Sequence, residues 1–218
     1  LNEKMDMRFD TYASMEAQVA ALSDDIAYNN HDVEDGIRAG LFSISDLEQV
    51  PLLADVLAEV RVKYPDISER YLVQELKRDM IGYMVDDVLK ETRKRLEQVK
   101  PESPDDIRNA GMHIVAFSPE MFEKVRKLRE FLFKRMYKHY TIERIGVKVE
   151  RIVCGLFEAF HKNYKLLPDN WQLRVKDGGG LDDERVRARI VADYIAGMTD
   201  RYAIREHERL FDLYWDLR

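Results

Sequence analysis

Residues 14–40 constrain the fold most strongly, because they form one continuous helix-forming stretch in which polar groups recur at a fixed interval. Ser14 is a suitable N-cap residue, and Gly36 and Gly40 mark the end of the stretch. The pattern therefore predicts one long amphipathic helix. Its expected buried stripe consists of Val19, Leu22, Ile26 and Val33.

Asp24, Tyr28 and Asp32 are spaced i, i+4 and i+8 on this helix, so they stack along about 12 Å of its axis. That length is roughly the reach of a nucleotide. Two carboxylates in one row are costly to bury unpaired, so a metal ion, a hydroxyl or a basic group is expected to meet them. Asp25 is rotated by about 100° from Asp24, so Asp24 is expected to face such a site. The pattern alone favours the simpler alternative, a solvated helix face.

The run Ala-Leu-Ser-Asp-Asp-Ile-Ala-Tyr-Asn-Asn-His-Asp-Val-Glu-Asp-Gly at 21–36 resembles the stretch around the last metal ligand in dGTPase-type deoxynucleoside triphosphate triphosphohydrolases. Residues 193–203 resemble the same family, which belongs to the HD superfamily of metal-dependent phosphohydrolases. The resemblance implies an all-α, HD-domain-like bundle. The family's upstream His and His-Asp motifs do not occur here, so we expect residues 1–218 to be the C-terminal portion of a longer enzyme.

The resemblance also implies roles for residues on the first helix. Asp24 matches the distant metal ligand, and Tyr28 and Asp32 match positions that contact the sugar. The metal would be a divalent ion such as Mg or Mn, whose bound water attacks the α-phosphorus of a deoxynucleoside triphosphate and releases triphosphate. One carboxylate cannot hold such an ion tightly, so the metal site is expected to be incomplete and the chain alone inactive.

A second helix is predicted from Pro119 onward, with basic residues around an apolar face. Arg129 and Tyr137 lie eight residues apart, again about 12 Å along a helix. The resemblance implies that Arg129 contacts the triphosphate and Tyr137 the deoxynucleoside, with Lys138 in the same pocket. A guanidinium suits phosphate because its planar fork donates two hydrogen bonds. From the residues alone, a surface helix with a Glu130–Lys134 ion pair is favoured.

The charges are unevenly distributed along the chain. Residues 1–60 contain thirteen acidic and three basic residues, a balance of −10, whereas residues 119–151 contain ten basic and five acidic residues, a balance of +5. An acidic helix would face a metal and a basic helix would face phosphate. Two ordinary solvated faces would give the same composition.

The remaining pattern predicts a single all-α domain over residues 1–218, with seven or eight helices. Further helices are expected at 50–64, 66–100 and 141–163, and a mobile loop at 164–181. Asp66, Asp182 and Thr199 are expected to cap helices. The apolar run 113–117 is read as a short strand or a plug in the core.

Cys154 lies among apolar residues, which suggests a buried thiol in a reducing compartment and hence a cytoplasmic protein without membrane spans. The long apolar stripe at 66–100 suits an intramolecular core or the interface of a homo-oligomer, and a homo-oligomer is expected. The alternative to an enzyme is a non-catalytic helical module that oligomerises, or one that binds single-stranded nucleic acid through its basic helix.

Overall fold

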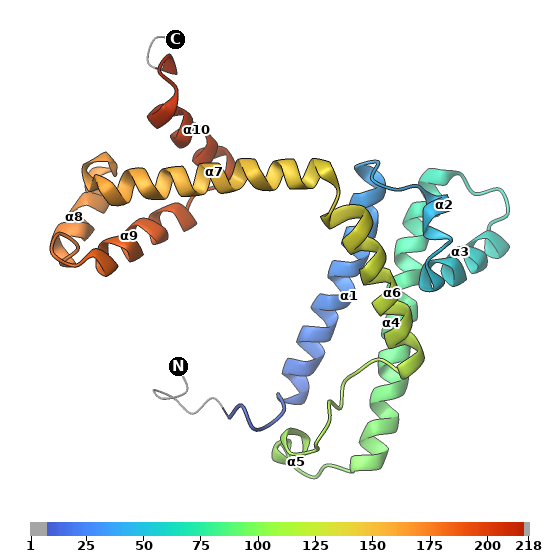
Figure 1. Ribbon diagram of the computed structural model, residues 1–218. Helices are drawn as coiled ribbons and strands as arrows, with labels where there is room; N and C mark the ends of the chain where they lie inside the picture. Colours follow the sequence, from blue (N-terminus) through green and yellow to red (C-terminus); the bar gives the residue numbers. More distant parts are fainter. Residues whose placement is uncertain (1–7, 216–218) are drawn as a thin grey trace. The chain divides into compact units, whose positions relative to one another are not determined.

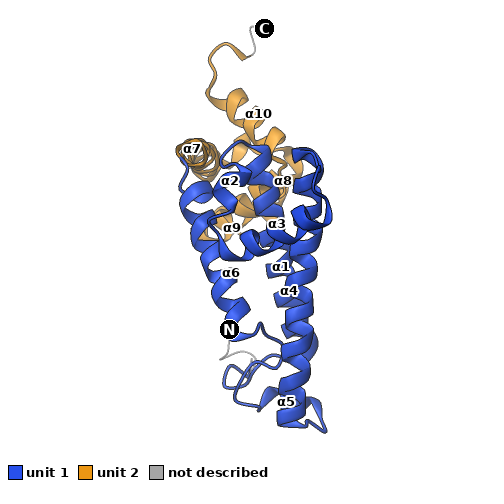
Figure 2. Cartoon of the chain, turned by 90° about the vertical axis from the view of Figure 1, so that its right-hand side faces the viewer, with its two compact units in different colours: residues 1–139 blue, residues 140–218 orange. Residues whose placement is uncertain are grey.

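The computed structural model describes residues 8–215, and within them all regular secondary structure is helical. Ten α-helices, one π-helix and one 3-10 helix follow one another along this part of the chain. The predicted all-α fold is therefore confirmed. The single domain predicted for residues 1–218 contains two compact units, residues 1–139 and residues 140–218, which Figure 2 shows in separate colours.

The first unit is built around three long helices. Helices α1 and α6 run in the same direction and α4 runs in the opposite direction (Figure 1). Helix α3 packs on both α4 and α6, and α1 packs on both of them as well. The helices of this unit are α1 (Met15–Arg38), α2 (Ile44–Leu47), α3 (Pro51–Lys63), α4 (Glu69–Val99), α5 (Pro104–Arg108) and α6 (Pro119–Leu132), which continues into the π-helix η1 (Phe133–Tyr137).

Side-chain caps fix where these helices begin. The Ser14 hydroxyl accepts a hydrogen bond from the Ala17 amide at 3.3 Å, as predicted. The Ser118 hydroxyl accepts one from the Met121 amide at 3.2 Å and starts α6. The N-cap of α4 is Ser68, two residues after the predicted cap at Asp66, and its side chain makes no capping hydrogen bond. The hydroxyls of Ser14 and Ser118 satisfy amides that a helix leaves unpaired.

The apolar stripe of α4 belongs to the core of the first unit. Leu72, Leu76, Met80 and Met84 are all buried there, and Val88 packs against this core half-buried. On α1, Ile26 and Val33 are buried as predicted. The prediction for Val19 was wrong: it is exposed, and the neighbouring Gln18 is buried in its place.

Gln18 is buried because it holds the connector between α5 and α6. Its carbonyl oxygen accepts hydrogen bonds from the amides of Ile114 and Val115 at 2.8 and 3.0 Å, and its amide nitrogen donates to the Ala13 carbonyl at 2.8 Å. Ile114, Val115 and Phe117 are buried. The apolar run therefore forms a plug without strand structure.

The second unit has its own small core. Leu156, Phe160, Leu167, Val175, Val191 and Tyr194 are buried together. Its elements are α7 (Tyr140–Lys162), the 3-10 helix η2 (Tyr164–Leu166), α8 (Asp169–Asp177), α9 (Glu184–Ala196) and α10 (Asp200–Phe211).

Two predictions for this unit need correction and one is confirmed. Residues 164–181 are not one loop, since they contain η2 and α8, and α8 is held by Trp171, whose ring packs 5.2 Å from that of Tyr194. Asp183 rather than Asp182 caps α9, whereas Thr199 caps α10 as predicted.

Cys154 is exposed rather than buried. It lies two residues from the buried Leu156, about 160° around α7, so its side chain is on the opposite face of the helix. None of the helices in residues 8–215 combines the length and apolar character needed to cross a membrane.

Replacing Gln18 by alanine is expected to loosen the connector. The amides of Ile114 and Val115 would stay buried without an acceptor, at about 1–3 kcal/mol for each orphaned group, so a loss of about 2–4 kcal/mol in unfolding free energy is expected. Urea unfolding followed by circular dichroism measures the loss, and hydrogen exchange at the two amides should accelerate. Gln74→Ala, at an exposed position of α4, is the matched control. An equal effect of both substitutions would contradict this account.

Candidate functional site

Three of the predicted site residues, Asp32, Arg129 and Tyr137, make contacts where α1 packs against α6 and η1. Gln18, Asp25 and Asp32 are spaced i, i+7 and i+14, and each step of seven residues turns the helix by only about 20°. These three polar residues therefore share one seam. Gln18 binds the connector, and the two aspartates contact α6 and η1.

The first contact across the seam is an ion pair. The Nη2 atom of Arg129 on α6 lies 3.1 Å from the Oδ2 atom of Asp25. Both side chains are half-exposed, so the pair adds at most about 1 kcal/mol to stability. Its atoms remain accessible to a ligand.

The second contact is buried. The Tyr137 hydroxyl donates a hydrogen bond to the Oδ2 atom of Asp32, whose residue is only 8% exposed. Burial raises the pKa of the Asp32 carboxyl, although the Tyr137 hydrogen bond counteracts part of that rise. Burial also raises the pKa of the Tyr137 phenol, and the bond to Asp32 adds to it. At neutral pH the phenol is therefore the proton donor of this pair.

The π-helix brings the two contacts into register. Asp25 and Asp32 are seven residues apart, whereas Arg129 and Tyr137 are eight apart, which would turn a regular α-helix by about 80°. In η1 the amide of Lys138 donates to the carbonyl of Phe133 at 3.0 Å, the i→i+5 bond of a π-turn, which accommodates one extra residue. The eight-residue interval thus matches the seven-residue interval on α1.

The π-helix is held in place from the side of α2. Nη2 of Arg135 lies 3.0 Å from Oδ1 of Asp46, and the Ser43 amide donates to the other carboxylate oxygen of Asp46 at 2.8 Å. The rings of Phe42 and Phe131 pack edge to face with centroids 5.1 Å apart. One ion pair therefore ties η1 to α2, and one aromatic contact ties the end of α6 to Phe42 just before α2.

Gly36 is required for this arrangement. A Cβ atom there would lie 2.1 Å from the Cζ atom of Phe42, far closer than real side-chain contacts allow. The glycine near the end of the predicted helix thus has a packing reason.

The other predicted residues lie around these contacts. Tyr28 is exposed one turn before Asp32, and its hydroxyl contributes to the raised pKa of Tyr137. Lys138 is exposed, with its ammonium nitrogen 5.8 Å from the centroid of the Phe133 ring. The structure therefore brings Tyr28, Asp32 and Tyr137 together and leaves Lys138 at the edge.

The two adjacent aspartates are both exposed, but only Asp25 pairs with Arg129 and lines a cavity. The reason is geometric: Asp24 is turned by about 80° from Asp32 because it is eight residues away, but Asp25 is turned by about 20°. The seven-residue spacing from Asp25 to Asp32 therefore places these two carboxylates on the same seam of α1. The role predicted for Asp24 as a metal ligand stays a prediction.

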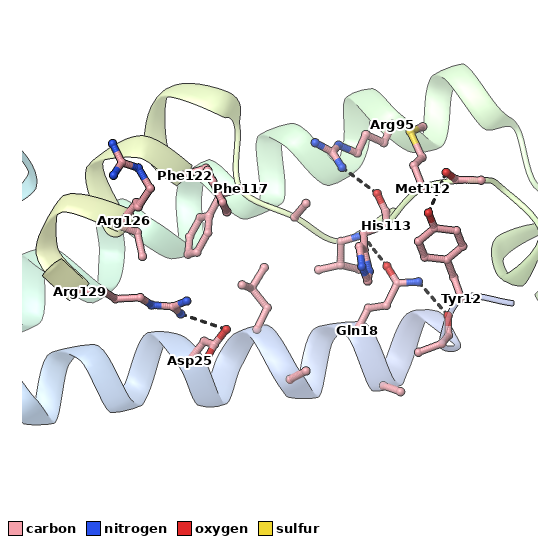
Figure 3. A pocket seen from close by; sticks show the side chains of 18 residues that line it. Tyr12, Gln18, Asp25, Arg95, Met112, His113, Phe117, Phe122, Arg126 and Arg129 are labelled. Atoms are coloured by element: carbon pink, nitrogen blue, oxygen red, sulfur yellow. Dashed lines mark hydrogen bonds and ion pairs between the residues drawn. The ribbon is translucent and has the colours of Figure 1, made fainter. Parts of the chain in front are cut away.

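The cavity has a volume of about 680 Å³ and lies between α1, the connector and α6 (Figure 3). Arg129 and Asp25 lie at one end of it, and Gln18, Tyr12 and His113 lie at the other (Figure 3). The sequence analysis did not identify these three as cavity residues. The Tyr12 hydroxyl donates to the Gly111 carbonyl at 2.9 Å, so this end is built by contacts between segments about 100 residues apart.

The predicted alternative was a surface helix whose charged side chains form ion pairs, and other residues of α6 do form such pairs. Glu130 pairs with Arg126 and not with Lys134. Lys124 lies 3.0 Å from Asp55 and 2.8 Å from Glu120. Much of the positive charge of α6 is thus compensated within the first unit, whereas Arg129 is directed to the seam.

A metal ion needs several ligands close together. Within residues 8–215, no group of three or more His, Cys, Asp or Glu side chains is arranged to hold one. The described residues therefore do not fit a complete divalent-metal site, and Asp24 or Asp25 would be one ligand among others.

Comparisons with known proteins show which proteins this chain is similar to. A family model described as a phosphohydrolase-associated domain matches residues 115–209. A deoxyguanosinetriphosphate triphosphohydrolase-like protein of Parvibaculum lavamentivorans is 47% identical over 212 residues, covering 97% of this chain and 52% of that protein. The chain is related to the deoxyguanosinetriphosphate triphosphohydrolase-like proteins. The resemblance seen in the sequence is thereby confirmed.

Two further triphosphohydrolase-like relatives show the same extent of similarity. The protein of a Caulobacter species is 49% identical over 203 residues, 93% of this chain and 50% of its own length. The protein of a Bradyrhizobium species is 45% identical over 217 residues, 100% of this chain and 54% of its own length. The chain thus spans about half the length of the curated relatives it matches.

Tyr137→Phe is expected to raise the pKa of Asp32 further. The hydrogen bond from Tyr137 favours the ionised carboxylate and so lowers the pKa of Asp32. Without this bond, the pKa rises because burial favours the neutral carboxyl. An aspartate whose pKa is higher in the folded than in the unfolded state makes the protein less stable as the pH rises through the folded pKa. The variant should therefore lose more unfolding free energy at pH 7 than in acid. The expected loss at pH 7 is about 1.5–3 kcal/mol.

An NMR titration of the Asp32 carboxyl carbon measures this pKa directly. Tyr71→Phe, on the exposed face of α4, is the control and should leave the titration unchanged. An unaltered or lower Asp32 pKa in Tyr137→Phe would contradict the assigned contact.

Proposed function

We propose that this chain forms one wall of the nucleotide site in a deoxynucleoside triphosphate triphosphohydrolase. The observation that carries the proposal is the seam in which Asp25–Arg129 and Asp32–Tyr137 lie in register on two helices that run in the same direction. The names of the relatives supply the reaction class, since they are called deoxyguanosinetriphosphate triphosphohydrolase-like.

The two contacts suit different parts of a nucleotide. The Arg129 side chain is half-exposed and would bind the triphosphate, exchanging Asp25 for phosphate oxygens. Asp32 would accept a hydrogen bond from a sugar hydroxyl, and Tyr28 and Tyr137 would contact the nucleoside with their rings. Lys138 would add positive charge at the edge of the site. About 10.5 Å separates Asp25 from Asp32 along α1, which matches the length of a nucleotide.

A divalent cation such as Mg or Mn is part of this proposal for the whole protein. Its chemistry would be to lower the pKa of a bound water and to neutralise phosphate charge. The described residues supply no complete site, so the other ligands would come from the half of the relatives' length that this chain does not span. Asp24 is the ligand proposed from the sequence, and Asp25 is the carboxylate that the geometry favours.

The alternative of a nucleic-acid-binding module finds less support. A nucleic acid would have to displace several carboxylates at once, since Arg126, Lys124 and Arg135 each lie in an ion pair. The Asp32–Tyr137 contact, in addition, offers a partner for a sugar hydroxyl and none for a phosphate backbone. Both observations favour the nucleotide hydrolase.

The first functional test separates the adjacent aspartates. In a protein of the relatives' full length that contains this chain, Asp25→Asn should lower kcat/KM by at least about tenfold more than Asp24→Asn, because Asp25 faces Arg129 and the cavity. Triphosphate release is the measurement. The 218-residue chain alone should release none, and it serves as the background control. A larger loss in Asp24→Asn would restore the assignment made from the sequence.

The second functional test separates phosphate from nucleoside recognition. Arg129→Ala should reduce kcat/KM by a similar factor for all four deoxynucleotides, about 1.5–3 kcal/mol, because they share the triphosphate. Tyr137→Phe should give losses that depend on the base or sugar, most clearly between a deoxynucleotide and its ribonucleotide. Lys134→Ala is the control for loss of a basic side chain on the same segment. Unchanged efficiencies across the panel would remove α6 and η1 from the site.

A further inference from the structure

The face of α6 that lines the cavity continues past Arg129 to Phe133. Phe122, Arg126 and Arg129 line the cavity (Figure 3). Phe133 follows them by eleven, seven and four residues, so it is turned from each by only about 20–40°. It is 53% exposed. An aromatic ring is therefore presented on this face, one turn beyond the ion pair of Arg129 with Asp25.

Helix α1 presents a second ring on the wall opposite. Ala17 and Ala21 line the cavity from α1. Tyr28 follows them by eleven and seven residues, so it is turned from each by only about 20°. It is 60% exposed. Each of the two helices thus extends its cavity wall with one exposed aromatic residue.

The two aromatic residues lie at nearly the same height along the seam. Tyr28 follows Asp25 by three residues, about 4.5 Å along α1. Phe133 follows Arg129 by four residues, about 6 Å along α6. Because Asp25 pairs with Arg129 and the two helices run in the same direction (Figure 1), both aromatic residues lie between this ion pair and the buried hydrogen bond at the other end of the seam.

Lys138 places a positive charge beside the Phe133 ring. Its ammonium nitrogen lies 5.8 Å from the ring centroid, within the range of a cation–π contact. The π-turn brings these side chains together, because its hydrogen bond joins the Lys138 amide to the Phe133 carbonyl. Single exposed aromatic residues are common on protein surfaces. This one differs because it lies in the register of the seam, in a segment that Arg135 and Asp46 tie to α2.

These features suit a flat aromatic group with polar edges. The faces of a nucleobase stack on aromatic side chains, and its edge atoms accept hydrogen bonds from an ammonium group. In the proposed site the triphosphate has Arg129 as its partner and the sugar has Asp32. The base is the part of the nucleotide that still lacks a partner on α6.

We propose that Phe133 binds the base of the nucleotide by stacking, on the opposite side from Tyr28. This inference rests on the proposed function, which places the triphosphate at Arg129. Every base has a π-face, so the contact holds purines and pyrimidines alike and contributes affinity for the nucleoside without selecting one base.

The test uses the two products of the proposed reaction as separate inhibitors of a protein of the relatives' full length that contains this chain. Phe133→Ala should raise the inhibition constant of deoxyguanosine by at least about fivefold and change that of inorganic triphosphate by less than about twofold, because only the nucleoside carries a base. Phe133→Tyr keeps the ring and should retain the deoxyguanosine constant. Phe122→Ala is the matched control, since it removes a similarly exposed phenylalanine from the same face of α6, on the other side of Arg129.

Arg129→Ala should show the opposite pattern, with a loss of inhibition by triphosphate. An unchanged deoxyguanosine constant in Phe133→Ala would overturn this inference and leave the proposed function in place. So would an equal loss for both inhibitors, or a larger effect of Phe122→Ala on deoxyguanosine. If the unmodified protein hydrolyses no deoxynucleoside triphosphate, the proposed function itself fails, and this inference fails with it.

Discussion

The buried hydrogen bond between Tyr137 and Asp32 is the interaction on which the candidate site depends. A carboxylate with so little exposure is stable only with a donor beside it, and the phenol is the donor that the fold provides. The bond joins α1 to the π-helix at the end of α6. It therefore sets how the acidic and the basic helix lie against each other, and it positions Arg129 opposite Asp25.

The seam requires a match between two helical intervals. Seven residues on α1 return to nearly the same face, but the eight residues from Arg129 to Tyr137 do so only because a π-turn absorbs the extra residue. Asp46, which holds Arg135, also caps α2, so the π-turn is tied to the rest of the first unit. An irregularity in one helix thus produces the regular spacing of the site.

Most of the helices could be predicted from the sequence, because apolar periodicity and caps such as Ser14 and Thr199 are local signals. The pairing of Asp25 with Arg129 was not predicted, because the row at i+4 and i+8 that was followed drifts around the helix, while the i+7 row does not. The π-turn has no local sequence signature and depends on contacts with α2. The exposure of Cys154 likewise depends on which face of α7 the second unit covers, which apolar neighbours in the sequence do not reveal.

A crystal structure of a protein of the relatives' full length, bound to a non-hydrolysable deoxynucleoside triphosphate, tests the central claim most directly. The account predicts that Arg129 leaves Asp25 to bind triphosphate oxygens, while the sugar lies against Asp32 and Tyr137. A nucleotide bound elsewhere, with the Asp25–Arg129 pair intact and no contact to Tyr137, would contradict it.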